Sequence, residues 1–234
     1  AINSDTILVS VMAVNNETGI IQPIKLVSNI ISKSGSPALF HCDAVQAFGK
    51  VNLKPQKLGV DLMSISSHKI HGPKGVGALY IRKGARIVPL HYGGEQERKI
   101  RPGTESLPLI CAFAEAVKAL PNIDDQHEKI EELWNYCKEK VLEIPNVYIN
   151  SPDGVLPYIL NISAVGVRSE TMLHYLAESG IYVSSGSACA KGKKSHVLTA
   201  MGLSPERIDS AIRISFSKFN TKAVSYTHLT LPTI

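Results

Sequence analysis

Two apolar runs, residues 60–65 and 76–81, flank the stretch Ser66-Ser67-His68-Lys69-Ile70-His71-Gly72-Pro73-Lys74-Gly75. Runs of this length predict short buried strands, and the glycines and proline between them predict a tight turn. Lys69 therefore follows the carboxyl end of a strand, which is where open α/β sheets bind their ligands. Because the turn leaves no room for a crossover helix, we expect the second strand to pair antiparallel to the first.

Asp43 follows another apolar run, residues 38–42, upstream of Lys69. Pyridoxal phosphate (PLP) needs such a pair, because a lysine amine forms a Schiff base with its aldehyde and a carboxylate keeps its pyridine nitrogen protonated. Ser66 and His68, just before the lysine, add to this interpretation. Plainer interpretations stay open, since a lysine after a strand is usually solvated and an aspartate at a strand end is often a helix N-cap.

Strand and helix patterns alternate along the first half of the chain. Residues 6–14 form a β-rich apolar run that we expect to be buried on both faces of a parallel sheet, and residues 24–34 predict a helix closed by Gly35. This order implies right-handed βαβ units and a doubly wound, mostly parallel α/β sheet. Asn15 and Asn16 follow the first strand, where an asparagine either makes a turn or donates its amide to a ligand oxygen.

The second half predicts a smaller C-terminal α/β domain, introduced by helices that begin near residues 107 and 125. Its expected strands are residues 147–149, 158–162, 181–183 and 211–215, and its expected helices are residues 170–178, 196–201 and 205–210. Arg213 lies between apolar residues of the last strand. An inward-pointing arginine needs an anion, either a substrate carboxylate or an internal salt bridge.

The composition, 44% hydrophobic and 19% charged with a net charge of +5, is that of an ordinary globular protein. No basic block is interleaved with aromatic residues, so we expect no nucleic-acid surface, although the cationic cluster of Lys191, Lys193 and Lys194 would suit an acidic protein partner. No apolar stretch approaches the roughly 20 residues that span a bilayer, and no signal peptide is evident.

The four cysteines lie far apart, without the CxxC spacing of a zinc site or the pattern of a disulfide scaffold, so we expect no metal and a reducing cytoplasmic setting. Cys42 and Cys111 fit the usual buried structural cysteine. Cys189 differs, because it lies among small, polar and cationic residues that should leave it exposed and favour its thiolate.

Six collinear segments resemble conserved blocks of the cysteine desulfurases, the NifS/IscS-like group of the class V aminotransferase family and of the fold-type I PLP enzymes. They are VSVMAVNNETGIIQPI (9–24), HCDAVQAFGK (41–50), DLMSISSHKIHGPKGVGALY (61–80), GGEQERKIRPGT (93–104), YVSSGSACA (182–190) and IRISFSKF (212–219). The resemblance implies part of a PLP-binding large domain at residues 1–115 and a small C-terminal domain with a catalytic cysteine loop at residues 116–222.

The resemblance also implies a role for each matching side chain. Lys69 would form the Schiff base, Asp43 would bind the pyridinium nitrogen, and Cys189 would be the nucleophile that takes the sulfur. The other implied contacts are Gln46 and Asn16 at the phenolic oxygen of the cofactor, Ser66 and His68 at its phosphate, Thr104 at the phosphate of the other subunit of a homodimer, and Arg213 with Asn16 at the substrate carboxylate.

The implied activity is PLP-dependent removal of sulfur from L-cysteine, which gives L-alanine and a persulfide on Cys189 for iron–sulfur cluster assembly or tRNA thiolation. A selenocysteine lyase or a class V aminotransferase is the alternative within the family, although a transaminase has no use for a thiol at this position. A non-catalytic module for dimerisation or acceptor binding is the alternative outside it.

Members of that family contain a glycine-rich phosphate turn and a ring-stacking histidine upstream of the point that matches Ala1. Residues 225–234 resemble translated adapter sequence, and we expect residues 223–234 to be a non-native tail. We therefore expect this chain to be a fragment that binds the cofactor weakly or not at all by itself.

Overall fold

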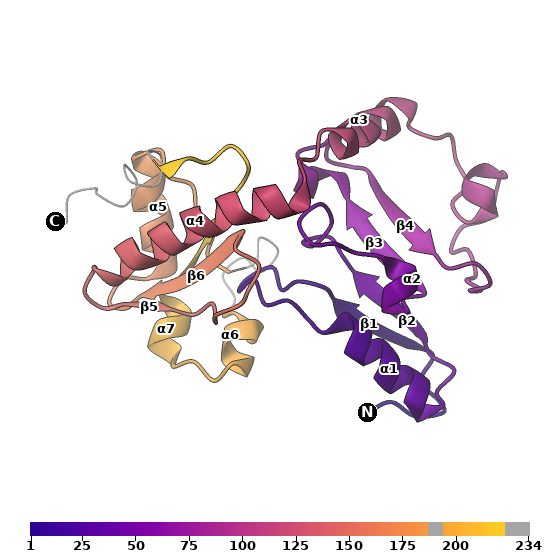
Figure 1. The fold of residues 1–234 in the computed structure, drawn as a ribbon, viewed down its shortest axis with the longest axis horizontal. Coiled ribbons are helices and arrows are strands. Elements are labelled where there is room, and N and C mark those ends of the chain that lie inside the picture. Colours follow the sequence, from indigo (N-terminus) through magenta and orange to yellow (C-terminus); the bar gives the residue numbers. More distant parts are fainter. Residues whose placement is uncertain (187–193, 223–234) are drawn as a thin grey trace. The chain divides into compact units, whose positions relative to one another are not determined.

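The structure of the chain is a computed structural model that describes residues 1–186 and 194–222 (Figure 1). These residues form two compact units. The first contains Ala1–Ala13 and Gln22–Ile123, and the second contains Val14–Ile21 and the chain from Asp124 onward. The units divide after Ile123, whereas the sequence places a domain boundary at 115/116, and that domain division stays a prediction.

A four-stranded sheet forms the centre of the first unit (Figure 1). Its strands, in spatial order, are β1 (Leu8–Met12), β2 (Leu39–Asp43), β3 (Leu62–Ser66) and β4 (Gly77–Ile81). The first three strands are parallel, and β4 pairs antiparallel to β3, as the short turn between them predicts. The prediction of a mostly parallel α/β sheet is therefore confirmed.

Short helices connect and flank these strands. They are α1 (Ile24–Ser34), α2 (Pro55–Leu58), the 3₁₀ helices η1 (Ser67–Ile70) and η2 (Gln96–Lys99), and α3 (Leu107–Lys118). Helix α1 has the predicted bounds because Gly35 adopts a left-handed φ of 68°, which ends the helix there. Its buried residues are Ile24 and Ile31, and the helix contacts β2.

The two faces of this sheet differ in burial. Phe40 and Cys42 of β2 and Met63 of β3 are buried, whereas Leu8 of β1 is 49% exposed. The expectation that the first strand is buried on both faces is wrong, because within the described residues β1 pairs only with β2. An apolar run of this length does not distinguish a central strand from an edge strand.

The less buried face carries a row of polar side chains. His41 bridges two neighbouring strands, since its Nδ1 lies 2.7 Å from the Ser10 Oγ and its Nε2 lies 2.7 Å from the Ser64 Oγ. In register, Ser64 pairs with Asp43, so this row approaches the strand ends where Asp43 and Lys69 lie.

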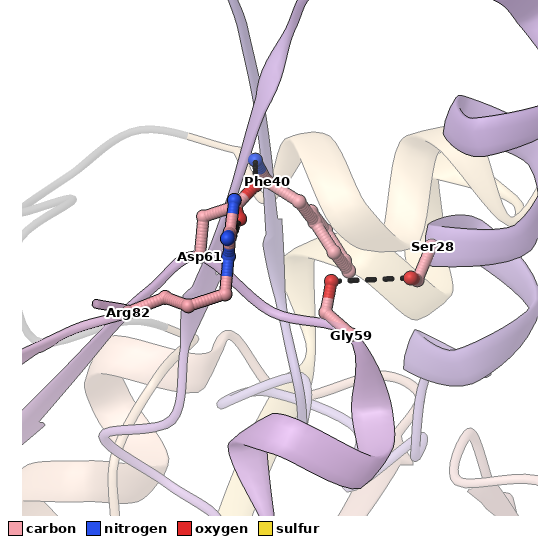
Figure 2. A network of polar contacts seen from close by, with 5 residues as sticks. All are labelled: Ser28, Phe40, Gly59, Asp61 and Arg82. Atoms are coloured by element: carbon pink, nitrogen blue, oxygen red, sulfur yellow. Dashed lines mark hydrogen bonds and ion pairs between the residues drawn. The ribbon is translucent and has the colours of Figure 1, made fainter. Parts of the chain in front are cut away.

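Asp61 ties together the opposite ends of β2, β3 and β4 (Figure 2). Its carboxylate accepts hydrogen bonds from the Phe40 amide at 2.8 Å and from the Arg82 Nε at 2.5 Å. Beside it, the Ser28 hydroxyl of α1 donates to the Gly59 carbonyl at 3.1 Å. The bonds of Asp61 thus hold the starts of β2 and β3 and the end of β4 together, on the side of the sheet opposite Asp43 and Lys69.

A three-stranded antiparallel sheet forms the second unit. Its elements are α4 (Ile123–Leu142, whose first residue belongs to the first unit), β5 (Val147–Ile149), β6 (Ile159–Ala164), α5 (Ser169–Glu178), α6 (His196–Ala200), α7 (Pro205–Asp209) and β7 (Ala211–Ser215). The predicted small α/β domain is thus recognisable. The strand expected at residues 181–183 is wrong, because only Ser184 forms an isolated bridge, to Arg213.

The core of the second unit lies between α4 and β6. Ile130 of α4 and Leu160 of β6 are fully buried, and the Trp134 Nε1 donates to the Ile159 carbonyl at 3.0 Å. Among the helices of the described residues, none has the length and apolar character needed to cross a membrane.

Candidate active site

Asp43 and Lys69 come from neighbouring strands at one edge of the first sheet. Asp43 is the last residue of β2, and Lys69 lies in η1, which begins directly after β3. Because β2 and β3 are parallel, their carboxyl ends share this edge. Both side chains are half-buried. The expectation that each of these residues lies at the carboxyl end of a strand is confirmed.

The turn that carries Lys69 is closely packed. Ser67 is fully buried, and the Gly72 amide donates to its carbonyl at 3.1 Å. A Cβ on Gly72 would lie 2.1 Å from the Ser67 Oγ, so any side chain there would force its neighbours to shift. The Ser67 hydroxyl finds no hydrogen-bond partner among the described residues. The glycine at this position therefore holds η1, and with it Lys69, against the end of the strand.

Ser66 and His68 form a polar pair at the same turn, with 2.7 Å between the Ser66 Oγ and the His68 Nδ1. Desolvation lowers the pKa of His68, and the positive charges of Lys69 and Lys74 lower it further. The imidazole is therefore neutral at neutral pH, in a region of positive potential. A hydroxyl, an imidazole and the nearby ammonium group of Lys74 are a donor set that suits a phosphate.

The Asp43 carboxylate stabilises the turn that follows β2, because its Oδ1 accepts from the Val45 amide at 2.9 Å. This is the capping contact that the plainer interpretation predicts. Within the described residues it is the one hydrogen bond of that carboxylate, which leaves the second oxygen for a cationic donor such as a pyridinium nitrogen. Gln46 lies half-buried in the same turn. These residues fit the pyridine side of PLP, the cofactor that the sequence resemblance implies.

The two asparagines after β1 have different roles. The Asn15 Oδ1 accepts from the Glu17 amide at 2.9 Å and from the Thr18 amide at 3.0 Å, so Asn15 makes the turn. The carbonyl of Asn16 accepts from the Arg213 Nη1 at 2.8 Å. The structure therefore brings Asn16 and Arg213 together within the second unit, although they are far apart in the sequence.

Arg213 lies half-buried on β7, and its Nη2 is 3.3 Å from the Ser184 Oγ. Burial lowers the pKa of its guanidinium, while the negative charge of Glu17 acts in the opposite direction. Within the described residues it forms no ion pair, and its buried Nε has no hydrogen-bond partner. An internal salt bridge is thus not observed, and the free Nε–H suits a substrate carboxylate.

The remaining predicted residues lie elsewhere. Thr104 is exposed between η2 and α3. Cys189 lies outside the described residues.

The other cysteines differ in burial. Burial raises the pKa of Cys42 to about 11, and the charge of Asp43 raises it further. Burial also raises the pKa of Cys137, to about 12. The prediction that Cys111 is buried is wrong, because it faces outward from α3.

The sequence reasoning missed Glu17, which is only 2% exposed. Its Oε2 accepts from the Ser195 Oγ at 2.5 Å. A signal was available, because Glu17 is the only charged residue between Asp5 and Lys25. A lone acidic residue in an otherwise uncharged strand-end turn needs a partner from elsewhere in the chain.

The mostly parallel sheet, with Asp43 and Lys69 at adjoining strand ends, has the fold of the solved NifS-like proteins. The family model for class-V aminotransferases matches residues 1–224, and the chain belongs to that family.

Several known proteins are similar to this chain. The cysteine desulfurase IscS of Methanosarcina thermophila is 43% identical over 225 residues, covering 94% of this chain and 55% of that protein. A solved NifS-like protein superposes with a TM-score of 0.90 at 40% identity, covering 97% of this chain and 60% of the other. A structure of SspA in complex with cysteine superposes with a TM-score of 0.75 at 34% identity, covering 92% and 60%. The chain thus spans less than two thirds of these relatives.

Proposed function

We propose that this chain is the part of a PLP-dependent cysteine desulfurase that carries the cofactor lysine, the substrate arginine and the sulfur-accepting cysteine. The observation that carries the proposal is the position of Lys69 and Asp43 at the carboxyl ends of adjacent parallel strands. The names of the relatives support cysteine desulfurization, and the cysteine bound to SspA supports cysteine as the substrate class.

The cofactor, when bound, supplies an electron sink for the breaking of bonds near the substrate α-carbon. In the proposal Lys69 binds the cofactor through its amine, and Asp43 keeps a proton on the pyridine nitrogen. Ser66 and His68 bind the phosphate in the positive potential of the turn, while Gln46 and Asn16 donate to the phenolic oxygen. Once released by the substrate, the Lys69 Nζ takes a proton from the α-carbon.

Arg213 and Cys189 act on the substrate in this proposal. The Arg213 guanidinium, with its unpartnered Nε–H, holds the substrate carboxylate. The Cys189 thiolate attacks the cysteine Sγ, so that an S–S bond forms as the Cβ–Sγ bond breaks. The electron pair of the broken bond stays with the substrate carbons, which take up protons and leave as L-alanine. Cys189 is left as a persulfide.

Further parts of the proposal concern partners. Thr104 of one copy binds the cofactor phosphate of a second copy in a homodimer. The persulfide passes to an acceptor protein of iron–sulfur cluster assembly or tRNA thiolation, and the lysines at 191, 193 and 194 favour an acidic acceptor surface. The widely spaced cysteines support a cytoplasmic location.

The test compares cysteine-dependent sulfide release, in the presence of a reductant, for the complete protein that carries this chain and its variants. We expect Cys189→Ala to lose sulfide release while the cofactor absorption band remains. Lys69→Ala should lose both. The matched control is Cys111→Ala, which removes an exposed thiol elsewhere and should release sulfide at the wild-type rate.

Two outcomes would reject the proposal in different ways. Sulfide release by Cys189→Ala at the wild-type rate would show that Cys189 does not accept the sulfur, and would reject the desulfurase mechanism. A protein that releases selenium from selenocysteine but no sulfur from cysteine, or that transfers only the amino group, would be the lyase or the aminotransferase instead.

A further inference from the structure

The turn after β1, residues 16–19, is held through its main chain. Each of its four consecutive carbonyls accepts a hydrogen bond from the part of the second unit beyond residue 150. The donors, in order along the turn, are the Arg213 Nη1 at 2.8 Å, the Asn161 Nδ2 at 3.1 Å, the Ser151 hydroxyl at 2.8 Å and the Leu156 amide at 2.9 Å. The turn belongs to the same unit, so these bonds fasten it within that unit.

Two of these donors are neighbours across the second sheet. Strands β6 and β7 are antiparallel, and in register Asn161 lies opposite Arg213. Side chains that lie directly opposite each other in such a pair share one face of the sheet. Asn161 and Arg213 bind adjacent carbonyls, those of Glu17 and Asn16. A displacement of the turn at Asn161 would therefore also displace the acceptor of Arg213.

Asn161 is the firmly held member of this pair. Its side chain is fully buried, and its Oδ1 accepts from the Asn150 Nδ2 at 2.8 Å. Its main-chain amide donates to the Ser151 Oγ at 2.8 Å. A buried amide with partners on both its oxygen and its nitrogen has one orientation, so Asn161 is a fixed point for the turn.

The guanidinium of Arg213 is held less firmly. Among the described residues its side-chain hydrogen bonds are the one to the Asn16 carbonyl at 2.8 Å and a longer one to the Ser184 Oγ at 3.3 Å. The Asn16 carbonyl is the shorter and better of the two. The orientation of the guanidinium therefore depends on where the turn places this carbonyl.

The Glu17 carbonyl connects the two side chains. Glu17 is only 2% exposed, so water has little access to it. Without the Asn161 amide, this carbonyl would be buried without its partner, which is costly unless the turn moves. The Asn16 carbonyl is in the next peptide unit and would move with it. Loss of one buried amide would thus reach the guanidinium through the turn.

We propose that Asn161 is a positioning residue for substrate binding, which holds the turn whose Asn16 carbonyl orients the Arg213 guanidinium toward the substrate carboxylate. The inference rests on the proposed function for the role of Arg213. The anchoring of the turn does not depend on that role, and the two are measured separately.

The first measurement is hydrogen exchange of the turn in the complete protein, followed by mass spectrometry of peptides that contain residues 15–21. The amide of Gly19 donates to the Asn15 carbonyl at 3.0 Å, and that of Thr18 donates to the Asn15 Oδ1 at 3.0 Å. Both amides are protected while the turn is held. We expect Asn161→Ala to exchange about tenfold faster here, as for the loss of one buried hydrogen bond.

The matched control is Ser163→Ala. Ser163 is also fully buried on β6 and, two residues further on, lies on the same face. Its hydroxyl donates to the Arg207 carbonyl and accepts from the Asn150 Nδ2, both at 2.7 Å, and within the described residues it makes no hydrogen bond to the turn. We expect the turn of Ser163→Ala to exchange at the wild-type rate.

A second variant at the same position covers the case in which Asn161→Ala does not fold. Asn161→Ser keeps a polar group beside Asn150, but its side chain is one atom shorter and loses the bond to the Glu17 carbonyl. It should also exchange faster at the turn. Exchange at the wild-type rate in the folded variant would overturn the anchor.

The second measurement is sulfide release by the complete protein as a function of L-cysteine concentration. We expect Asn161→Ala to raise the half-saturating concentration about tenfold at an unchanged kcat, because a carboxylate contact acts equally before and during the reaction. Ser163→Ala should match the wild type. In Arg213→Lys, which lacks the planar fork, adding Asn161→Ala should raise the half-saturating concentration by clearly less than tenfold.

The outcomes separate the inference from the proposed function. Faster exchange with a wild-type half-saturating concentration, or a full tenfold effect in the Arg213→Lys protein, would overturn the positioning role. A wild-type protein that releases no sulfide from L-cysteine would reject the proposed function and with it the carboxylate role. The exchange rates would still decide whether Asn161 holds the turn.

Discussion

His68 shows how one residue can report on the cofactor. Its pKa lies below the usual value because of desolvation and the charges of Lys69 and Lys74. A phosphate bound at this turn would place negative charge beside the imidazole, which favours the protonated form and raises the pKa. We expect the NMR titration of His68 in the complete protein to move to higher pH when PLP is added.

The cofactor absorption band makes this prediction specific. If PLP gives its absorption band while the His68 titration stays where it was, the phosphate binds elsewhere.

The position of a single residue could be predicted from the sequence only where its neighbours in the sequence define its surroundings. Lys69 and Asp43 could be placed from the sequence, because apolar runs and turn residues mark the strand ends on which they lie. Glu17 could not be assigned its partner, since Ser195 is 178 residues away and no local pattern connects them. The prediction that Cys111 is buried was wrong because it was based on residue type alone, which does not say which face of a helix a residue occupies.

At the scale of elements, the helix η1 depends on the absence of a side chain at Gly72. A Cβ there would meet the Ser67 Oγ at 2.1 Å and the Cβ of Ala116 in α3 at 3.0 Å. We expect Gly72→Ala to destabilise the protein by about 1–3 kcal/mol, as overpacking does, and to weaken PLP binding because Lys69 moves with η1. Urea unfolding and the cofactor absorption band measure the two effects.

The buried Ser67 hydroxyl supplies the control for this prediction. It has no hydrogen-bond partner among the described residues, so Ser67→Ala should cost little by itself. When Ser67→Ala is combined with Gly72→Ala, the new Cβ no longer meets the Ser67 Oγ. We expect this double variant to regain part of the stability and cofactor binding that Gly72→Ala loses. A double variant that is no better than Gly72→Ala would show that η1 is held in some other way.

Elements with a local end signal were predicted closely, and elements defined by distant pairing were not. Helix α1 ends where Gly35 allows a left-handed residue. The expected strand at residues 181–183 forms no ladder, because pairing of this segment begins only at Ser184 and is limited to one bridge with Arg213. The prediction that the first strand is buried on both faces was also wrong, since the burial of a strand depends on neighbours that its own sequence does not specify.

At the scale of the whole molecule, the chain passes three times between the two units. It leaves the first unit after Ala13, contributes Val14–Ile21 to the second, returns at Gln22, and enters the second unit again after Ile123. Asn16 therefore lies with Arg213 rather than in the unit that holds Lys69. A sequence pattern of alternating strands and helices gives no sign of such an excursion, because the segment is a short turn that continues a predicted strand.

The second unit should lose stability in alkaline solution through Cys137. Its pKa is raised from 9.0 to about 12 by burial, so the folded state keeps the proton that the unfolded chain releases. The resulting stability is complete below pH 9 and falls as the pH rises toward 12, by about 1 kcal/mol for each pH unit. We therefore expect the unfolding free energy of the wild type to fall between pH 9 and pH 11 more steeply than that of Cys137→Ala.

Urea unfolding followed by the fluorescence of Trp134, which lies in the same helix, reports on this unit. Cys111→Ala, which replaces an exposed thiol of the first unit, should leave this pH dependence unchanged. A difference in stability between wild type and Cys137→Ala that is the same at pH 8 and pH 11 would mean that the thiol ionises without opening the core around α4.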